Sequence, residues 1–361
     1  MTVSAIVLAA GEGTRMRSTR PKPLHMMCGR PMVLHVIAAL ERLQPARTAL
    51  VVGHGAEQVT KKVQDLAPAW ANVVFVEQAE QRGTGDAAAT GMTAFPGDDL
   101  DDDSTVVVVP GDTPLLLPET LDELVATHVA NGSAATLLTS VVEDPTGYGR
   151  VITGKDGRVV RIVEQRDASP EEQAIDEVAT SIYAFRRDLL GPALRSITPD
   201  NAQGELYLTD VIGVLAGMGH RVGRVQAPGE ETQGVNDRVQ LARAEHELRS
   251  RTNRHWLLNG VTMVDPSQTF IDVTVQLGRD VTLYPGAILQ GNTVVGDGTE
   301  IGPHTRLDDC AIGRHCRIQH TVGLEAEVGD DARVGPYCHL PAGSSVAEGT
   351  TTGPFYTAST D

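Results

Sequence analysis

Near its N-terminus the chain reads Ile6-Val7-Leu8-Ala9-Ala10-Gly11-Glu12-Gly13-Thr14-Arg15-Met16, and Pro21-Lys22-Pro23-Leu24 follows shortly after. The apolar part of this stretch, residues 5–10, predicts a short buried strand, and the two glycines end it because glycine adopts backbone conformations that regular elements exclude. The stretch 32–40 predicts a helix. A strand, a glycine loop and a helix in this order are typical of α/β domains that bind phosphate through backbone N–H groups.

Two cationic side chains accompany the glycine loop. Arg15 and Lys22 can donate hydrogen bonds to phosphate oxygens from the same segment. The loop is not the dinucleotide-binding fingerprint, because no third glycine follows Gly13, and it is not a P-loop, because no Gly-Lys-Ser/Thr follows at the required spacing. On spacing alone, an ordinary strand-to-helix turn is a strong alternative.

Length and composition restrict the class of protein. The 361 residues, 41% of them hydrophobic, are enough for two domains with an ordinary core. The net charge of 30 − 47 = −17 disfavours nucleic acid and anionic membranes as partners. Four cysteines without a CxxC pair disfavour a disulfide scaffold or a zinc site. With no signal peptide and no run long enough to span a bilayer, we expect a cytoplasmic protein.

Alternating strands and helices continue beyond the loop. Apolar runs at 49–52, 73–76, 105–109 and 136–142 predict strands of a parallel sheet, and ligands bind at the carboxyl ends of such strands. Asp112 lies just past one of these ends, where a carboxylate is a good Mg²⁺ ligand. Its alternative role is to cap the helix predicted at 118–130.

Three further polar segments indicate which ligands the chain could bind. The acidic run 98–103 predicts a solvated loop rather than a calcium site, because it lacks the glycine and the terminal glutamate of a calcium loop. In 144–151, two glycines flank Tyr148, which indicates backbone close to a ligand. The stretch 159–164 predicts a hairpin strand that ends at Glu164, whose carboxylate could accept hydrogen bonds from sugar hydroxyls.

Several of these motifs together resemble one family. The glycine loop with Pro21-Lys22 resembles the signature of the sugar-phosphate nucleotidyltransferases, and Gly111-Asp112-Thr113-Pro114-Leu115 shares that family's G-D-x-P-L pattern. Four further segments narrow the resemblance to the bifunctional N-acetylglucosamine-1-phosphate uridylyltransferase/glucosamine-1-phosphate acetyltransferase family. They are Asp144-Pro145-Thr146-Gly147-Tyr148-Gly149-Arg150, Ile162-Val163-Glu164, the stretch 201–210, and Gly234-Val235-Asn236-Asp237-Arg238.

The resemblance implies a fold, a reaction and a set of site residues. The fold is a mixed, mostly parallel α/β nucleotidyltransferase domain, glycosyltransferase-A-like, over 1–226, followed by a linker helix over 227–260. The reaction converts UTP and N-acetylglucosamine-1-phosphate into UDP-N-acetylglucosamine and pyrophosphate. The implied residues are Arg15 and Lys22 for catalysis; Leu8, Ala9, Ala10, Gly11, Gly13, Gln78, Gly83 and Thr84 for the nucleotide; Tyr148, Gly149, Glu164 and Ala179 for the sugar; and Asp112 and Asn236 for Mg²⁺.

Two of these residues have structural alternatives. Thr84, or Asp86 beside it, could be the N-cap of a helix, and without the resemblance this interpretation is favoured. Asn236 could be the N-cap of the helix predicted from Val239, a role compatible with metal binding in the same loop.

One departure from the family pattern matters for the sugar site. Where the family has E-[IV]-N-[TA]-G, this chain has Glu177-Val178-Ala179-Thr180-Ser181, and Ala179 has no side-chain donor or acceptor. Either one sugar contact is absent, which costs about 0.5–1.5 kcal/mol, or Thr180 or Ser181 supplies it. The change could shift the preferred sugar without abolishing transfer.

The last hundred residues carry a different pattern. Apolar residues recur at hexad spacing, which predicts a parallel β-helix over 261–361 with these residues pointing to its axis. They are Leu277, Leu283, Leu289, Val295, Ile301, Leu307, Ile312, Ile318, Leu324, Val328, Val334, Leu340 and Val346. The resemblance implies a left-handed coil, and we expect it to form a homotrimer. Three cysteines in the repeats, Cys310, Cys316 and Cys338, are interpreted as packing residues.

We expect no acetyltransferase activity. The family turn L-R-P-G is replaced by Leu340-Pro341-Ala342-Gly343, and the family's catalytic histidine lies beyond Asp361. Three alternatives stay open: transfer to another hexose-1-phosphate or from another nucleotide, an inactive scaffold that binds nucleotide-sugar, and a chain truncated from a bifunctional protein.

Overall fold

A computed structural model describes residues 2–95, 104–155 and 157–359. The chain divides into two compact units. The first comprises Met1–His25 and Pro31–Leu241, and the second comprises Met26–Arg30 and Ala242–Asp361. The acidic run predicted as a solvated loop, 98–103, lies outside the described residues.

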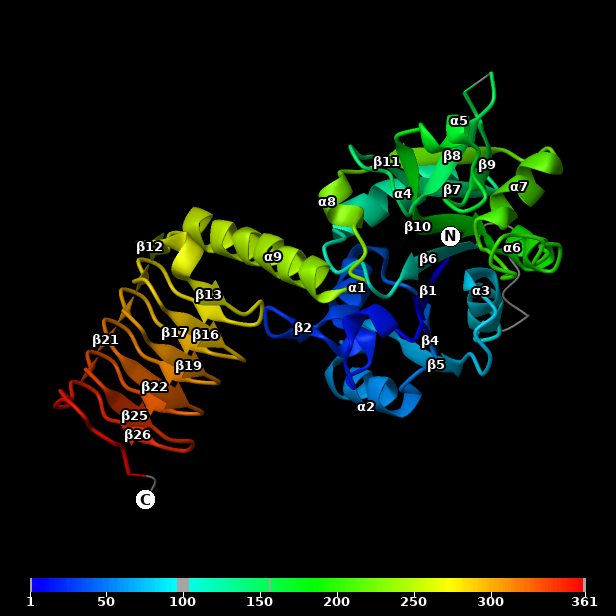
Figure 1. Cartoon of the computed structure of the whole chain (residues 1–361). Coiled ribbons are helices and arrows are strands. Elements are labelled where there is room, and N and C mark those ends of the chain that lie inside the picture. The colour runs from blue at the N-terminus through cyan, green and yellow to red at the C-terminus, as the bar shows by residue number, and fades with distance from the viewer. Residues whose placement is uncertain (1, 96–103, 156, 360–361) are drawn as a thin grey trace. The chain divides into compact units, whose positions relative to one another are not determined.

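The described part of the first unit is organised around a nine-stranded sheet (Figure 1). Its main path runs β11-β7-β10-β6-β1-β4-β5, and the hairpin β8–β9 attaches to β10. Strand β10 is antiparallel to both neighbours, whereas β1, β4, β5 and β6 are parallel. The mixed, mostly parallel sheet predicted from the sequence is therefore confirmed. The strands are β1 (Val3–Ala9), β4 (Arg47–Val52), β5 (Val73–Glu77), β6 (Thr105–Pro110), β7 (Ala135–Val141), β8 (Gly149–Thr153), β9 (Val159–Val163), β10 (Glu177–Arg186) and β11 (Val222–Gln226).

Helices cover both faces of this sheet because both faces of its central strands are apolar. On β1, Ile6 belongs to one hydrophobic core and its neighbour Val7 to the other. Helices α3, α6 and α7 contribute to the first core, and α1, α2 and α4 to the second. The helices are α1 (Met32–Ala39), α2 (Ala56–Leu66), α3 (Thr84–Met92), α4 (Pro118–Ala130), α6 (Arg187–Leu194) and α7 (Asp210–Gly217), with short α5 (Pro170–Gln173) and α8 (Gly229–Thr232) and two-residue strands β2 (Met26–Met27) and β3 (Arg30–Pro31).

The second unit is a left-handed parallel β-helix that follows α9 (Arg238–Leu258). Within its described residues, short strands stack into three five-stranded parallel sheets, one for each side of the coil. The sides are β12 (Thr262–Met263), β15 (Thr282–Leu283), β18 (Glu300–Ile301), β21 (Arg317–Ile318) and β24 (Arg333–Val334); β13 (Phe270–Ile271), β16 (Ile288–Gln290), β19 (Arg306–Asp308), β22 (Thr321–Leu324) and β25 (Cys338–Leu340); and β14 (Gln276–Leu277), β17 (Val294–Val295), β20 (Ala311–Ile312), β23 (Glu327–Val328) and β26 (Ser345–Val346).

One inward position predicted from the repeat is wrong. On β22 it is Gly323, not Leu324, that aligns with Leu307 below and Leu340 above. A Cβ at Gly323 would lie 3.0 Å from Leu307 Cδ2 and 3.2 Å from Cys310 Sγ, so the neighbouring side chains already fill that level of the axis. The hexad spacing predicted the nearby Leu324 at this inward position. Close packing of the neighbouring coils instead requires a residue without a side chain, Gly323.

The cysteines of the repeats agree with the packing role predicted from the sequence. Cys310, Cys316 and Cys338 are buried in the core of the β-helix, and each of the chain's four cysteines is free. Among the described residues, no helix combines the length and apolar character needed to cross a bilayer.

Candidate active site

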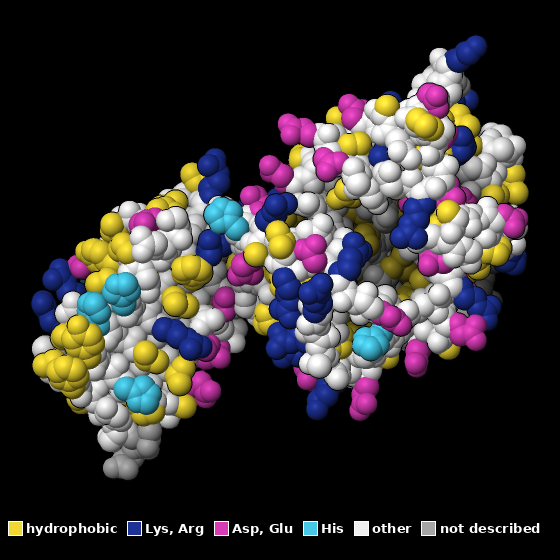
Figure 2. Space-filling view, in the orientation of Figure 1, with side chains coloured by type: hydrophobic (Ala, Val, Ile, Leu, Met, Phe, Trp, Pro, Cys, Tyr) yellow, Lys and Arg dark blue, Asp and Glu magenta, His cyan; other side chains and the backbone are white. Residues whose placement is uncertain are grey.

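A cavity of about 650 Å³ opens in the first unit at the carboxyl ends of β1 and β6. In the space-filling view it forms a hollow with Lys and Arg side chains near its rim (Figure 2). All the predicted site residues line it except Gly13 and Gly149. Segments from Leu8 to Gln240 therefore meet at one place, and this volume suits a small-molecule ligand.

The two exceptions lie directly behind lining residues. Gly13 has φ 64°, and a Cβ there would lie 2.6 Å from Lys22 Cβ. Because Gly13 has no side chain, the Lys22 side chain can pack directly against the backbone of the loop. Gly149 pairs with Ala179 of β10, and a Cβ on it would lie 3.5 Å from Glu164 Oε1.

Four predicted residues form one charged cluster, which we call the cationic cluster: Arg15, Lys22, Asp112 and Asn236. The Lys22 ammonium forms an ion pair with Asp112 and donates to Asn236 Oδ1 at 2.9 Å. Arg15 Nη2 donates to the same amide oxygen at 3.0 Å. The Lys22 side chain is only 14% exposed, so its charge is poorly screened by water. With two cations and one carboxylate, the cluster has a charge excess of +1 that suits a phosphate group.

Backbone contacts hold the two oxygen donors of the cluster together. Val235 N donates to Asp112 O at 2.8 Å, which ties the loop before α9 to the end of β6. Asp237 Oδ1 accepts from Gln240 N at 2.8 Å and so caps the start of α9. The alternative role of Asn236 as the helix cap is therefore wrong, because its neighbour caps the helix and its own side chain faces the cluster.

The cluster fits a divalent cation by the chemistry of its donors. Asp112 Oδ2 and Asn236 Oδ1 both contact the Lys22 ammonium, so a carboxylate and an amide oxygen converge on one positive charge. Within the ranges that the structure describes, no group of three or more His, Cys, Asp and Glu residues could hold a metal. A cation here would thus keep water or substrate oxygens as further ligands, which is typical of Mg²⁺.

The end of the cavity near β5 carries amide side chains. Gln78 Nε2 donates to Asp86 Oδ2 at 2.7 Å, and Gln81 Nε2 donates to Ala10 O at 2.9 Å. Gln78 is buried and its position is fixed by this bond. These residues present a rigid polar edge against which a flat ring could bind.

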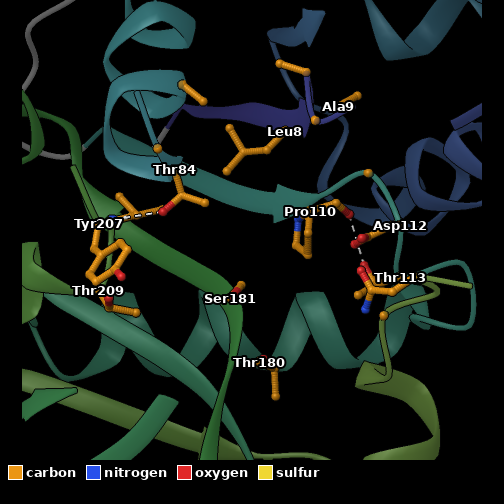
Figure 3. A pocket seen from close by; sticks show the side chains of 18 of the residues that line it. Leu8, Ala9, Thr84, Pro110, Asp112, Thr113, Thr180, Ser181, Tyr207 and Thr209 are labelled. Carbon is orange, nitrogen blue, oxygen red and sulfur yellow. Dashed lines mark hydrogen bonds between the residues drawn. The ribbon is translucent and has the colours of Figure 1, made fainter. Parts of the chain in front are cut away.

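Thr84 does not cap α3. No side chain caps this helix, whose N-cap is Gly83. Instead, Thr84 Oγ1 accepts from Leu208 N at 3.0 Å (Figure 3). The capping interpretation of Thr84 and Asp86 is therefore wrong, and Thr84 holds the loop 206–208 against the cavity.

A carboxylate also lines the cavity. Glu164 Oε1 accepts from Thr209 Oγ1 at 3.0 Å. Burial raises the pKa of Glu164, the Thr209 hydrogen bond lowers it, and the carboxylates of Asp210 and Asp167 raise it further. Thr209 was not predicted as a site residue, although it belongs to the 201–210 stretch that supported the resemblance.

Arg150 is a second residue that was not predicted. It is 1% exposed, donates to Tyr148 O, and donates from Nη2 to Gln165 Oε1 at 2.7 Å. The same Gln165 oxygen accepts from Gly147 N at 3.2 Å. Arg150 therefore fixes the loop that brings Tyr148 to the cavity. Its place in the quoted Gly-Tyr-Gly-Arg segment was the only signal in the sequence.

We expect Arg150→Lys to lower the free energy of unfolding by about 2 kcal/mol. Lysine keeps the charge but lacks the planar guanidinium group, which donates hydrogen bonds to both Tyr148 and Gln165. Urea denaturation measures this change. The matched control is Arg161→Lys at a half-exposed ion pair, for which we expect a loss below about 0.5 kcal/mol. Equal losses in the two variants would contradict the role of Arg150.

Comparison with known proteins agrees with this geometry. The family model described as the MobA-like NTP transferase domain matches residues 5–197. The bifunctional protein GlmU of Streptomyces avermitilis is 49% identical over 343 residues, which cover 94% of this chain and 70% of that protein. The GlmU of Thermobifida fusca is 47% identical (90% and 67% covered), and that of Corynebacterium efficiens is 45% identical (96% and 71%). The chain belongs to the GlmU family.

Membership of the GlmU family confirms the resemblance found in the sequence. The nucleotidyltransferase match includes Arg15, Lys22, Asp112 and Glu164 but ends before Asn236. The structure adds Asn236 to the cluster through contacts that a local match to 5–197 does not contain. The chain spans about 70% of the length of its GlmU relatives.

Proposed function

We infer that this chain is a sugar-1-phosphate nucleotidyltransferase that forms UDP-N-acetylglucosamine and pyrophosphate from UTP and N-acetylglucosamine-1-phosphate. The observation that carries this inference is that the cationic cluster and the Glu164–Thr209 pair line one cavity. The cluster suits phosphates, and the pair suits sugar hydroxyls. A nucleotide-sugar has both groups in one molecule.

The proposed reaction needs no covalent enzyme intermediate. An oxygen of the sugar phosphate attacks the α-phosphorus of UTP, and the bond from that phosphorus to the bridging oxygen of pyrophosphate breaks. Catalysis then consists of positioning and charge stabilisation. Lys22 and Arg15 would neutralise charge on the phosphates, Gln78 and Gly83 would bind the base, and Tyr148 and Glu164 would orient the sugar.

The family uses a divalent metal ion, and we propose Mg²⁺ held by Asp112 and Asn236. When bound, the ion supplies further neutralisation of phosphate charge. We also propose a homotrimer formed through the β-helix, and the lack of acetyltransferase activity that Pro341-Ala342 in place of the family's Arg predicts.

The test is pyrophosphate release from UTP with a panel of sugar-1-phosphates. We expect release to be fastest with N-acetylglucosamine-1-phosphate and to stop when EDTA removes divalent ions. Fastest release with another sugar would keep the mechanism but change the product. No release with any sugar, together with binding of nucleotide-sugar, would favour the scaffold alternative and contradict the proposed reaction.

We expect Glu164→Gln to raise Tm at pH 7 while weakening sugar binding. Because the pKa of Glu164 is raised in the folded state, the stability linked to this carboxyl is present below its unfolded pKa and is lost as pH rises through its folded pKa. Glutamine cannot ionise, and its carbonyl oxygen can still accept from Thr209.

Thermal unfolding at several pH values measures this effect. The Tm difference between Glu164→Gln and wild type is expected to be largest at neutral pH and to disappear in acid. Glu57→Gln, at an exposed position of α2, is the matched control and is expected to show no such difference. A lower Tm of Glu164→Gln at neutral pH would contradict the argument.

A further inference from the structure

Asn236 is the residue at which the two cations of the cationic cluster meet. Its Oδ1 accepts from Lys22 Nζ at 2.9 Å and from Arg15 Nη2 at 3.0 Å. An amide oxygen has two lone pairs, so both bonds persist only while the backbone of Asn236 keeps one position. The contacts that fix this backbone therefore decide the geometry of the cluster.

The chain on either side of Asn236 is anchored to other segments of the first unit. Val235 N donates to Asp112 O at 2.8 Å, and Arg238 Nε donates to Met16 O at 3.1 Å. Neither bond involves the backbone N–H of Asn236. This group needs a partner of its own, because an N–H group that is shielded from water and unpaired is costly.

Gln240, the third residue of α9, is that partner. Its Oε1 accepts from Asn236 N at 2.7 Å, while its backbone N donates to Asp237 Oδ1 at 2.8 Å. The arrangement resembles a capping box, in which the third residue of a helix accepts from the backbone N–H of the N-cap residue. Here the bond goes one residue earlier, to Asn236, so the glutamine fixes a residue of the cationic cluster.

The chemistry of a glutamine side chain suits this place. Gln240 lines the cavity, as Asn236 does. Its amide oxygen accepts a hydrogen bond without adding charge. A glutamate would cancel the charge excess of +1 that suits a phosphate group, and an apolar residue would leave the Asn236 N–H without its partner.

We propose that Gln240 is a positioning residue that fixes the backbone of Asn236 and so keeps the Asn236 amide oxygen in place for the divalent cation. The proposal rests on the proposed function, in which Asn236 and Asp112 hold Mg²⁺. Without the Gln240 bond, the loop that precedes α9 loses one of its anchors. The part of UTP binding that depends on the metal then weakens.

Hydrogen–deuterium exchange at the Asn236 amide tests the bond without any ligand. We expect Gln240→Met, which has a similar length but no amide oxygen, to speed this exchange about three- to tenfold. Gln240→Glu keeps an acceptor and is expected to keep the protection. The matched control is Gln58→Met, because Gln58 is the third residue of α2, is exposed and does not line the cavity. Unchanged exchange in Gln240→Met would overturn the proposal.

Calorimetric titration with UTP, in Mg²⁺ and in EDTA, tests the consequence for the metal. We expect Gln240→Met to weaken UTP binding about three- to tenfold in Mg²⁺ and to leave it unchanged in EDTA. Gln240→Glu adds a charge that repels UTP in both buffers, yet it is expected to retain the gain in affinity that Mg²⁺ provides. Equal losses of Gln240→Met in the two buffers, or a lower Tm with wild-type UTP binding, would show that Gln240 only stabilises the helix.

Neither measurement depends on turnover. If pyrophosphate release fails while the Gln240 effects appear, the proposed reaction is contradicted and the positioning role is supported. Normal release without these effects contradicts the positioning role alone. If Gln240→Met does not fold, Gln240→Ala, which also lacks the amide oxygen, takes its place in both experiments.

Discussion

Asp112→Asn is expected to lower kcat for pyrophosphate release by about 10²–10³-fold. The substitution preserves the shape of the side chain but removes the one carboxylate of the cationic cluster. Asn236 then remains as the only predicted metal ligand, and a neutral amide is a weaker ligand for a hard divalent cation than a carboxylate. Saturating UTP and sugar-1-phosphate in the assay separate the loss of kcat from a change in binding.

The same variant is expected to stay folded. The Asp112 side chain is 25% exposed, and an asparagine oxygen can still accept from Lys22, so we expect a Tm close to that of wild type. Asp122→Asn, at an exposed position of α4, is the control for a changed charge away from the cavity. Turnover of Asp112→Asn within a factor of a few of this control would rule out the metal assignment.

Lys22→Met is expected to have a loss of similar size, about 10²–10³-fold in kcat. Methionine keeps the apolar stem that packs against Gly13, so the loop geometry is retained while the ammonium is removed. The charge excess of the cluster falls from +1 to zero, and phosphate charge is then less stabilised. The measurement is again pyrophosphate release at saturating substrates.

Two comparisons make this result specific. Lys61→Met, on the exposed side of α2, removes the same charge away from the cavity and is expected to leave kcat unchanged. The double variant Lys22→Met/Asp112→Asn is expected to lose less than the product of the single losses, because the two groups contact each other and act on the same phosphates. If the kcat loss of the double variant equalled the product of the two single losses, Lys22 and Asp112 would act independently, which would contradict a shared site.

Local patterns were sufficient for most of the fold and for the charged residues. Strand β1, the glycine loop and Lys22 lie close together in the sequence, so their order already indicated a phosphate site. Asp112 followed an apolar run that was long enough to be a central strand, which placed it at the ligand edge of the sheet. The hexad spacing repeated often enough to predict the β-helix.

Residue roles that depend on distant segments were decided only by tertiary structure. Their neighbours in sequence allowed Asn236 and Thr84 to cap helices, and the contacts of their side chains with Arg15 and Leu208 showed that they do not. Arg15 and Asn236 are 221 positions apart. At Gly323, the size of the axial residue was set by the coils above and below rather than by spacing.

Strand β10 shows the same division most clearly. The sequence showed that Ala179 departs from the family pattern. The irregular pairing of β10 with β7 and the hydrogen bond that Thr180 donates to Leu138 O were set by the strand that the fold places beside it. A local pattern specifies which face of a strand is buried, but the partner of a buried polar atom is set by the segments that the fold brings beside it.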